Sequence, residues 1–81
     1  MSDTRQYTVI IEKGETNWGA YSPDVPGCGV VADTRTEVEQ LIAEALVFHF
    51  EGLLLAGQRI PEPVSDAITV AVSLPELSHI A

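Results

Sequence analysis

The stretch SPDVPGCGVVADT, residues 22–34, decides how this chain folds, because it holds a corner, a short strand and the start of a helix. Its VPGC portion, residues 25–28, has the composition of a type II turn: the proline presets φ at the second position, and the glycine accepts the positive φ needed at the third. Pro23 ends the preceding segment, and Asp24 can bond amides just downstream as an Asx turn. Corner geometry therefore explains most of these residues.

The end of this stretch predicts a long helix. Thr34 and Glu37 match a capping box, in which the first side chain bonds the backbone amide of the second residue. Apolar or weakly polar residues then recur at the i, i+3, i+4, i+7 spacing of a helix face: Val38, Leu41, Ile42, Ala45, Leu46, His49 and Leu53. Gly57 is the expected stop.

Extended segments flank the corner and the helix. Residues 7–12, YTVIIE, alternate and are β-branched, residues 13–17 supply a polar turn, and WGAY from Trp18 resumes an extended pattern, so the sequence predicts a hairpin. GVVA, residues 29–32, is the expected third strand.

Two different segments follow the helix. Residues 58–66, QRIPEPVSD, cannot be helical, because their two prolines remove donors and favour extended backbone. Residues 67–74, AITVAVSL, predict a fourth strand with Ile68, Val70 and Val72 on one face.

These elements give the order β-β-β-α-β. We expect an α+β fold, with a four-stranded, mostly antiparallel sheet and one helix packed on one face. The 81 residues suffice for a single domain, with residues 1–6 and 75–81 as tails.

Composition narrows the functional classes. Twelve acidic residues against four Lys and Arg give a net charge of −8, which disfavours direct nucleic-acid binding and suits a basic partner protein, although solubility alone also explains it. One cysteine excludes an intramolecular disulfide, the first residues lack a signal peptide's pattern, and no apolar run approaches the roughly 20 residues that span a bilayer. We therefore expect a cytoplasmic protein without a membrane segment.

The sequence gives little support for a catalytic, metal-binding or phosphate-binding site. A nucleophilic Cys28 would need a base and a positive environment, yet the histidines are His49 in the helix and His79 in the tail, and Asp24 and Asp33 flank the thiol in sequence. A packed structural thiol is the favoured interpretation. Cys28, His49 and His79 lack the spacing of zinc ligands. Residues 27–34 match no phosphate-binding loop.

Two acidic residues lie at the ends of predicted strands. Glu12 and Asp33 do not amount to the several converging carboxylates of a two-metal nuclease site. His49, on the apolar face of the helix, is expected to be a core or interface residue. No catalytic residue, metal or cofactor is expected.

The second half of the helix is apolar on nearly every side. Four residues lie off the face that should meet the sheet, namely Phe48, Phe50, Leu54 and Leu55. One sheet face cannot cover them all, so they indicate self-association into a dimer or tetramer. The alternative is that residues 58–63 wrap this helix end.

Residues 7–63 together resemble the HicB-like antitoxin family. The resemblance rests on the P-D-x-P-G-C corner of residues 23–28, on D-T-x-x-E at residues 33–37, and on G-x-x-I-P-x-P at residues 57–63. It implies the amino-terminal, degraded RNase H-like domain of that family, without the DNA-binding extension that many members carry. It also implies a non-enzymatic antitoxin that binds and neutralises a small basic, mRNA-cleaving toxin.

The resemblance leaves the contact residues open. We expect a partner interface at Trp18, Tyr21, Pro23 and Asp24, unless these aromatics simply pack the sheet. The alternative function is an orphan homo-oligomer of the same fold that binds a small ligand or serves only in assembly.

Overall fold

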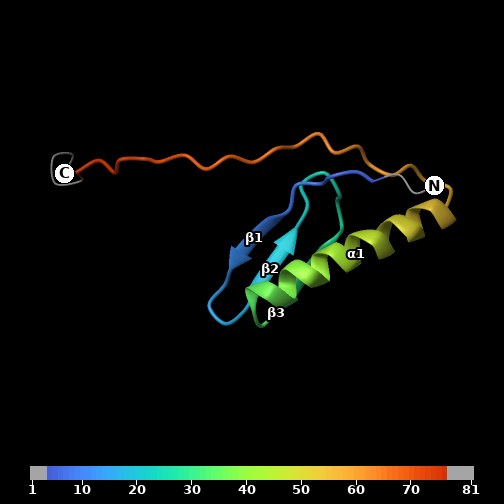
Figure 1. Ribbon diagram of the computed structural model, residues 1–81, viewed down its shortest axis with the longest axis horizontal. Coiled ribbons are helices and arrows are strands. Elements are labelled where there is room, and N and C mark those ends of the chain that lie inside the picture. The colour runs from blue at the N-terminus through green and yellow to red at the C-terminus, as the bar shows by residue number, and fades with distance from the viewer. Residues whose placement is uncertain (1–3, 77–81) are drawn as a thin grey trace.

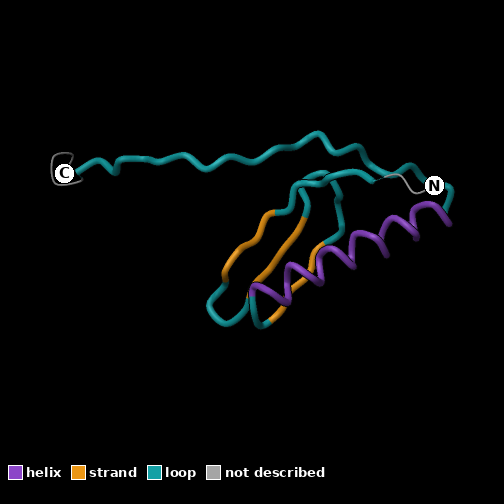
Figure 2. The backbone as a smooth tube through the Cα atoms, in the orientation of Figure 1, coloured by secondary structure: helices purple, strands orange, loops and turns teal. Residues whose placement is uncertain are grey.

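The computed structural model describes residues 4–76, as a small sheet covered by a helix (Figure 1). The order is β1 (Ile10–Lys13), β2 (Trp18–Tyr21), β3 (Gly29–Ala32) and α1 (Arg35–Leu55). The strands form one antiparallel sheet in the order β1-β2-β3, and α1 lies across one face of it (Figure 2). The α+β class and the first four elements are therefore confirmed.

The hairpin of β1 and β2 follows from its turn residues. Ile10 lies opposite Tyr21, and Lys13 lies opposite Trp18. The Gly14 amide donates to the Asn17 carbonyl at 2.8 Å and closes the loop. The paired strand begins at Ile10, three residues later than the alternation suggested, so residues 7–9 lie outside the sheet pairing.

The corner has the predicted turn. The Cys28 amide donates to the Val25 carbonyl at 3.3 Å, and Gly27 has φ of +84°, the positive value that this turn requires at its third position. Asp24 behaves differently from the prediction. Instead of bonding amides just downstream, its carboxylate bonds backbone 40 residues further along the chain. The local Asx turn was therefore wrong.

Both helix ends carry the expected caps. The Glu37 amide donates to the Thr34 hydroxyl at 3.1 Å, and that hydroxyl donates to the Glu37 carboxylate at 2.9 Å. At the other end, the Gly57 amide bonds the Leu54 carbonyl and the Gln58 amide bonds the Leu53 carbonyl, with Gly57 at φ +72°. This is the Schellman arrangement, so Gly57 ends the helix as predicted.

The core lies between α1 and the β2–β3 side of the sheet. Its buried apolar residues are Ala20, Val25, Cys28, Val38, Ile42 and Leu46. The helix contributes a row spaced by four residues, and Phe50 continues that row one turn later, partly buried. Leu41, which the pattern placed on the buried face, is 40% exposed, because the row is narrower than predicted.

The predicted fourth strand is not formed. Residues 66–76 leave the sheet in an extended course without a strand partner among the described residues (Figure 1). The Cα radius of gyration is 17.1 Å, whereas a compact domain of this length has about 12 Å. A β-strand exists only where its backbone pairs with another, so the alternation in residues 67–74 identified strand potential rather than a strand. The four-stranded sheet was wrong for this chain alone.

Candidate functional site

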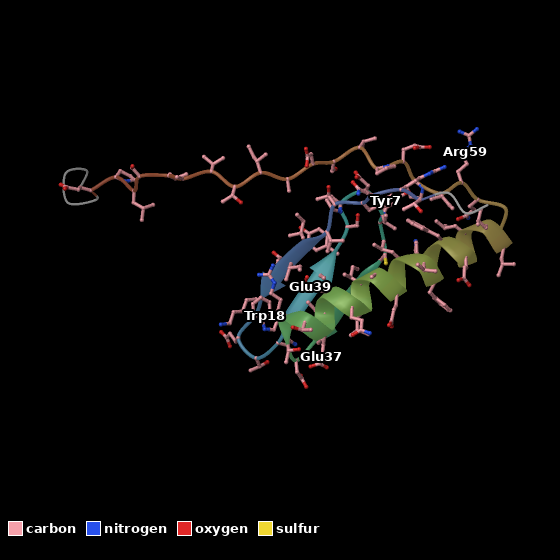
Figure 3. All side chains as sticks on the ribbon, viewed as in Figure 1. Tyr7, Trp18, Glu37, Glu39 and Arg59 are labelled. Carbon is pink, nitrogen blue, oxygen red and sulfur yellow. The ribbon has the colours of Figure 1, made fainter. Side chains whose placement is uncertain are left out.

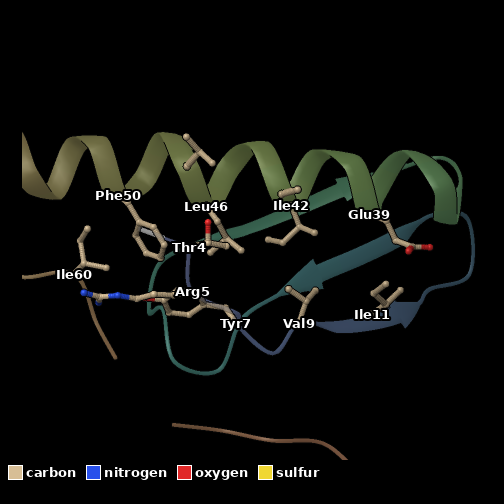
Figure 4. A pocket seen from close by; sticks show the side chains of 12 residues that line it. Thr4, Arg5, Tyr7, Val9, Ile11, Glu39, Ile42, Leu46, Phe50 and Ile60 are labelled. Carbon is tan, nitrogen blue, oxygen red and sulfur yellow. The ribbon is translucent and has the colours of Figure 1, made fainter. Parts of the chain in front are cut away.

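An open groove of about 620 Å³ lies between α1 and the β1 side of the sheet (Figure 4). It exists because α1 packs mainly on β3 and β2 and leaves the β1 edge uncovered. Its apolar walls are Tyr7, Val9 and Ile11 on one side and Ile42, Leu46 and Phe50 on the other. The Tyr7 and Phe50 rings, one from each wall, meet with centroids 5.1 Å apart.

Polar side chains of this groove come from Thr4, Arg5 and Glu39. Arg5 Nη1 lies 3.6 Å from Glu62 Oε1, and the Tyr7 hydroxyl donates to the Pro61 carbonyl at 2.6 Å. The groove therefore has a predominantly apolar lining, and the chain that follows the helix is fastened beside it.

A second groove, of about 430 Å³, lies on the other flank of α1. This groove lies between the corner and that flank of the helix. Its lining includes Cys28, His49 and the exposed Phe48. Cys28 is buried, and this burial raises the pKa of its thiol. Cys28 and His49 both line this groove, and because a neutral thiol is a poor nucleophile, the raised pKa favours the structural interpretation of Cys28. The His49 ring instead meets the edge of Phe50, at 6.5 Å between centroids.

Asp24 fastens the C-terminal segment to the corner. One carboxylate oxygen, Oδ2, accepts from the Val64 amide at 3.0 Å and the Ser65 amide at 2.8 Å, and Oδ1 accepts from the Ser65 hydroxyl at 2.7 Å. The hydrogen bond from the Ser65 side chain is the main cause that lowers the pKa of Asp24, followed by that from the Ser65 amide. The Ser65 carbonyl also accepts from the Thr8 hydroxyl at 2.6 Å. We call this set of contacts the Asp24–Ser65 anchor.

The residues expected to touch a partner do not share one environment. Trp18 is half-buried against the core, with Lys13 Nζ 5.7 Å from its ring centroid, whereas Tyr21 and Pro23 are exposed. Trp18 lies near the start of α1, and Arg59 lies just beyond its end (Figure 3). Asp24 has both oxygens occupied by the anchor.

The helix residues expected to self-associate divide in the same way. Phe48 is 78% exposed and Leu55 is 90% exposed, and Leu54 is exposed with them. Phe50 instead turns inward onto Tyr7. The residues after α1 do not cover this exposed set as the wrapping alternative required, since Phe48 and both leucines remain open to solvent.

The acidic pair considered for metal chemistry is spread across the sheet. Glu12 is in β1 and Asp33 follows β3, with β2 between these strands. Strands two places apart are about 10 Å apart. Within residues 4–76, no group of three or more His, Cys, Asp or Glu side chains is placed to hold a metal ion. His79 lies outside the described residues. No helix in this part of the chain is both long and apolar enough to cross a membrane.

The Asp24–Ser65 anchor is the feature that sequence reasoning missed. The sequence predicts a local turn and a partner contact for Asp24, and it predicts only a non-helical, proline-containing segment around Ser65. The available signal was the rigid spacing of Pro61 and Pro63 before a serine, which holds an extended segment ready to be bonded. Nothing in the sequence paired that serine with an aspartate 41 residues earlier.

Comparisons with known proteins give one family match and two related proteins. A family model described as a HicB-like antitoxin of a bacterial toxin-antitoxin system matches residues 7–80. The chain is 35% identical over 63 residues to Antitoxin HicB 2 of Photorhabdus laumondii subsp. laumondii, covering 78% of this chain and 45% of that protein. It is 36% identical over 70 residues to an uncharacterised 14.9 kDa protein from the rep-hol intergenic region of Haemophilus phage HP1, covering 86% of this chain and 51% of that protein.

The two matches to curated proteins cover most of this chain but only part of each relative. The chain spans about half the length of the curated relatives it matches. No solved structure matches the chain significantly.

Proposed function

The chain belongs to the HicB-like antitoxin family of bacterial toxin-antitoxin systems, and from this premise we propose that it binds and neutralises a small basic toxin that cleaves messenger RNA. The family match over residues 7–80 is the observation that carries the proposal. A toxin that grips RNA must present a positive surface, and this chain has a net charge of −8. Opposite charges would steer the two proteins together, and buried contacts would hold them.

The outward face of α1 supports this proposal. Glu37, Glu44 and Glu51 recur every seven residues, so they lie along one side of the helix, and all three are exposed. Phe48 and Leu55 are exposed apolar residues on the same helix. Acidic groups beside large apolar side chains suit a basic partner that must also bury surface.

The corner extends the proposed contact. Tyr21 and Pro23 are open to solvent and remain candidate contacts. Trp18 and Asp24 would act on the partner mainly by holding this region in shape, because one packs against the core and the other forms the anchor. Neutralisation of this kind covers the toxin's RNA-binding surface and needs no catalytic residue in the antitoxin.

Two further properties belong to the proposal. We infer a cytoplasmic location, because the partner acts on messenger RNA, and no direct contact of this acidic chain with nucleic acid. We also infer that the chain self-associates, since its exposed apolar surface is large for an isolated small domain. The described sheet and helix would then be part of a degraded RNase H-like unit.

Co-expression tests the antitoxin role. Where a gene beside this one encodes a small basic protein, that protein is expressed alone and together with this chain, and growth and co-purification are scored. We expect growth arrest by the neighbour alone, rescue by this chain, and a complex that survives purification. A neighbour that is toxic but neither bound nor rescued would sink the proposal.

The groove beside β1 favours a second candidate function. Its volume and apolar lining fall in the range of small-molecule pockets, so an oligomeric module that binds a small apolar ligand is the alternative. Native mass spectrometry of the purified protein separates the two functions. A stoichiometric small molecule retained by the protein, together with failure to rescue growth, would favour the ligand-binding module.

A further inference from the structure

The segment 67–74 has the pattern of a half-buried strand, yet it has nothing to be buried against. Its even-numbered residues Ile68, Val70, Val72 and Leu74 are each between 64% and 86% exposed. The residues between them are small or weakly polar: Ala67, Thr69, Ala71 and Ser73. One apolar face and one small face are typical of a strand that packs one side on a core. We call residues 67–74 the arm.

The same chain has a sheet edge that lacks a strand. β1 pairs with β2 on one side, and no described strand lies on its other side. That edge borders the 620 Å³ groove, into which Val9 and Ile11 project from the β1 side (Figure 4). The apolar face of a strand added to this edge would enter the groove beneath Ile42 and Leu46.

The arm is long enough to cover the edge. Eight extended residues span about 26 Å, the four residues of β1 span about 13 Å, and β1 with residues 7–9 before it spans at most about 23 Å. The core is incomplete at this open apolar groove, and the arm carries four of the large apolar side chains that the described residues leave exposed to solvent. Each molecule thus presents both a strand and a vacant position for one.

The course of the arm points to a second molecule. The Asp24–Ser65 anchor fixes the chain next to Thr8, close to the start of β1, but the arm then runs away from its own sheet (Figure 1). The molecule reaches 58 Å in its longest dimension and 28 Å in the next. An arm so extended is available to the β1 edge of a neighbouring copy.

Charge favours a copy of this chain over a basic partner as the occupant. Residues 67–74 contain no charged side chain, so they offer nothing that a positive toxin surface would select. They also bring no like charge to the contact between two acidic chains. The acids nearest the arm in sequence, Asp66 and Glu76, flank it at either end.

We propose that two copies of this chain exchange arms, so that residues 67–74 of each copy pair along the free edge of β1 in the other and fill its groove. The inference rests on the self-association put forward under the proposed function, but not on the toxin. The exchanged arm adds a fourth strand to the sheet, which has three strands within residues 4–76 of one chain. Dimerisation and completion of the core are then one event.

Matched substitutions in the full-length chain test the exchange. Val70→Asp puts a charge on the apolar face of the arm, and Thr69→Asp puts the same charge on its small face. In sedimentation experiments on the pure protein, we expect Val70→Asp to raise the dimer dissociation constant about 100-fold, because a buried unpaired charge is costly, and Thr69→Asp to change it less than about threefold. Equal effects of the two substitutions, or no effect of either, would overturn the proposal.

Isotope-filtered NMR decides which molecule receives the arm. Chains labelled with ¹³C and unlabelled chains are mixed, unfolded and refolded, and contacts from the methyl groups of Ile68 and Val70 are recorded. Contacts to Val9 and Ile11 of the other chain support the exchange. Contacts within one chain only, contacts to β3 or between the two arms, or arms that become ordered only when the toxin is added would each overturn it.

These results separate the two proposals. The sedimentation and labelling experiments use the pure protein, so a failure there leaves the growth rescue by co-expression untouched. Conversely, a chain that exchanges arms but does not rescue growth would support the arm-exchanged dimer and contradict the proposed neutralisation of a toxin.

Discussion

Cys28 is the residue whose chemistry the structure constrains most directly. It is buried at the corner, and its raised thiol pKa keeps it neutral. Cys28→Ser places a hydroxyl in this apolar position, and we expect it to lower the free energy of unfolding by about 1 kcal/mol while toxin binding stays intact. Thermal melting and a binding titration check both expectations, with Cys28→Ala as the control for lost volume. Loss of binding with an unchanged melting curve would contradict the structural role.

Asp24 makes the C-terminal segment sensitive to acid. Its hydrogen bonds to Ser65 and Val64 lower its pKa below the ordinary 3.8, so its contribution to stability is present above that value and is lost as the pH falls through the lower, folded-state pKa. We expect the Val64 and Ser65 amides to lose protection from hydrogen exchange as the pH falls below 3.8.

Two substitutions control this acid sensitivity. Asp24→Asn should leave both amides weakly protected at every pH, and Asp33→Asn, at an exposed acid after β3, should leave the pH profile unchanged. Amide exchange followed by NMR makes the measurement. A profile that survives in Asp24→Asn would assign the acid sensitivity to another group.

At the scale of the element, replacing a glycine by alanine should change the stability of the protein in opposite directions inside α1 and at its end. Gly57 holds φ of +72° at the helix end, whereas Gly52 lies inside the helix with open space where a Cβ would be. Gly57→Ala should therefore destabilise the protein by about 1 kcal/mol, and Gly52→Ala should stabilise it by a similar amount. Chemical denaturation of both variants checks the difference. Shifts of the same sign would show that the Schellman cap does not control this end.

The elements also mark how far the sequence could predict the structure. The corner, the hairpin turn and both helix caps depend on residues within a few positions of each other, so Gly14, Gly27, Thr34 and Gly57 specified them correctly. The arm is the exception. Its alternation is real, but pairing depends on a partner edge, and the pattern of residues 67–74 alone does not say which molecule holds that edge.

The candidate site was predictable only in part, for the same reason. Exposure of Phe48 and Leu55 followed from the helical pattern, but the inward turn of Phe50 depends on Tyr7, which lies more than 40 residues away in sequence. The groove beside β1 results from where α1 crosses the sheet. Crossing position is a property of packing between elements, and no short motif encodes it.

At the scale of the whole molecule, the charge of −8 predicts how binding responds to salt. Between about 0.01 and 0.15 M salt the screening length falls from about 30 to 8 Å, so we expect association with a basic toxin to slow at least about tenfold. The dissociation rate, set by buried contacts, should change far less. Stopped-flow mixing measures the association rate, and release of the toxin from surface-bound complexes measures the dissociation rate.

A pair of variants locates the charges responsible. Glu44→Gln removes an acid from the outward face of α1, and Glu15→Gln removes one from the hairpin loop. The first should slow association more than the second at low salt. An association rate that ignores salt in every variant would contradict electrostatic steering.

The arm and the free β1 edge also bear on solubility, because each chain is both donor and acceptor of a strand. Two chains that exchange reciprocally close into a finite dimer, whereas chains that pass their arms onward in one direction would grow into an open-ended fibre. The residues around the arm oppose that growth: Asp66 precedes it, and Pro75 and Glu76 follow it. The balance between closure and polymerisation therefore rests on a few flanking residues, and neutralising the acids at both ends of the arm would shift it toward polymer.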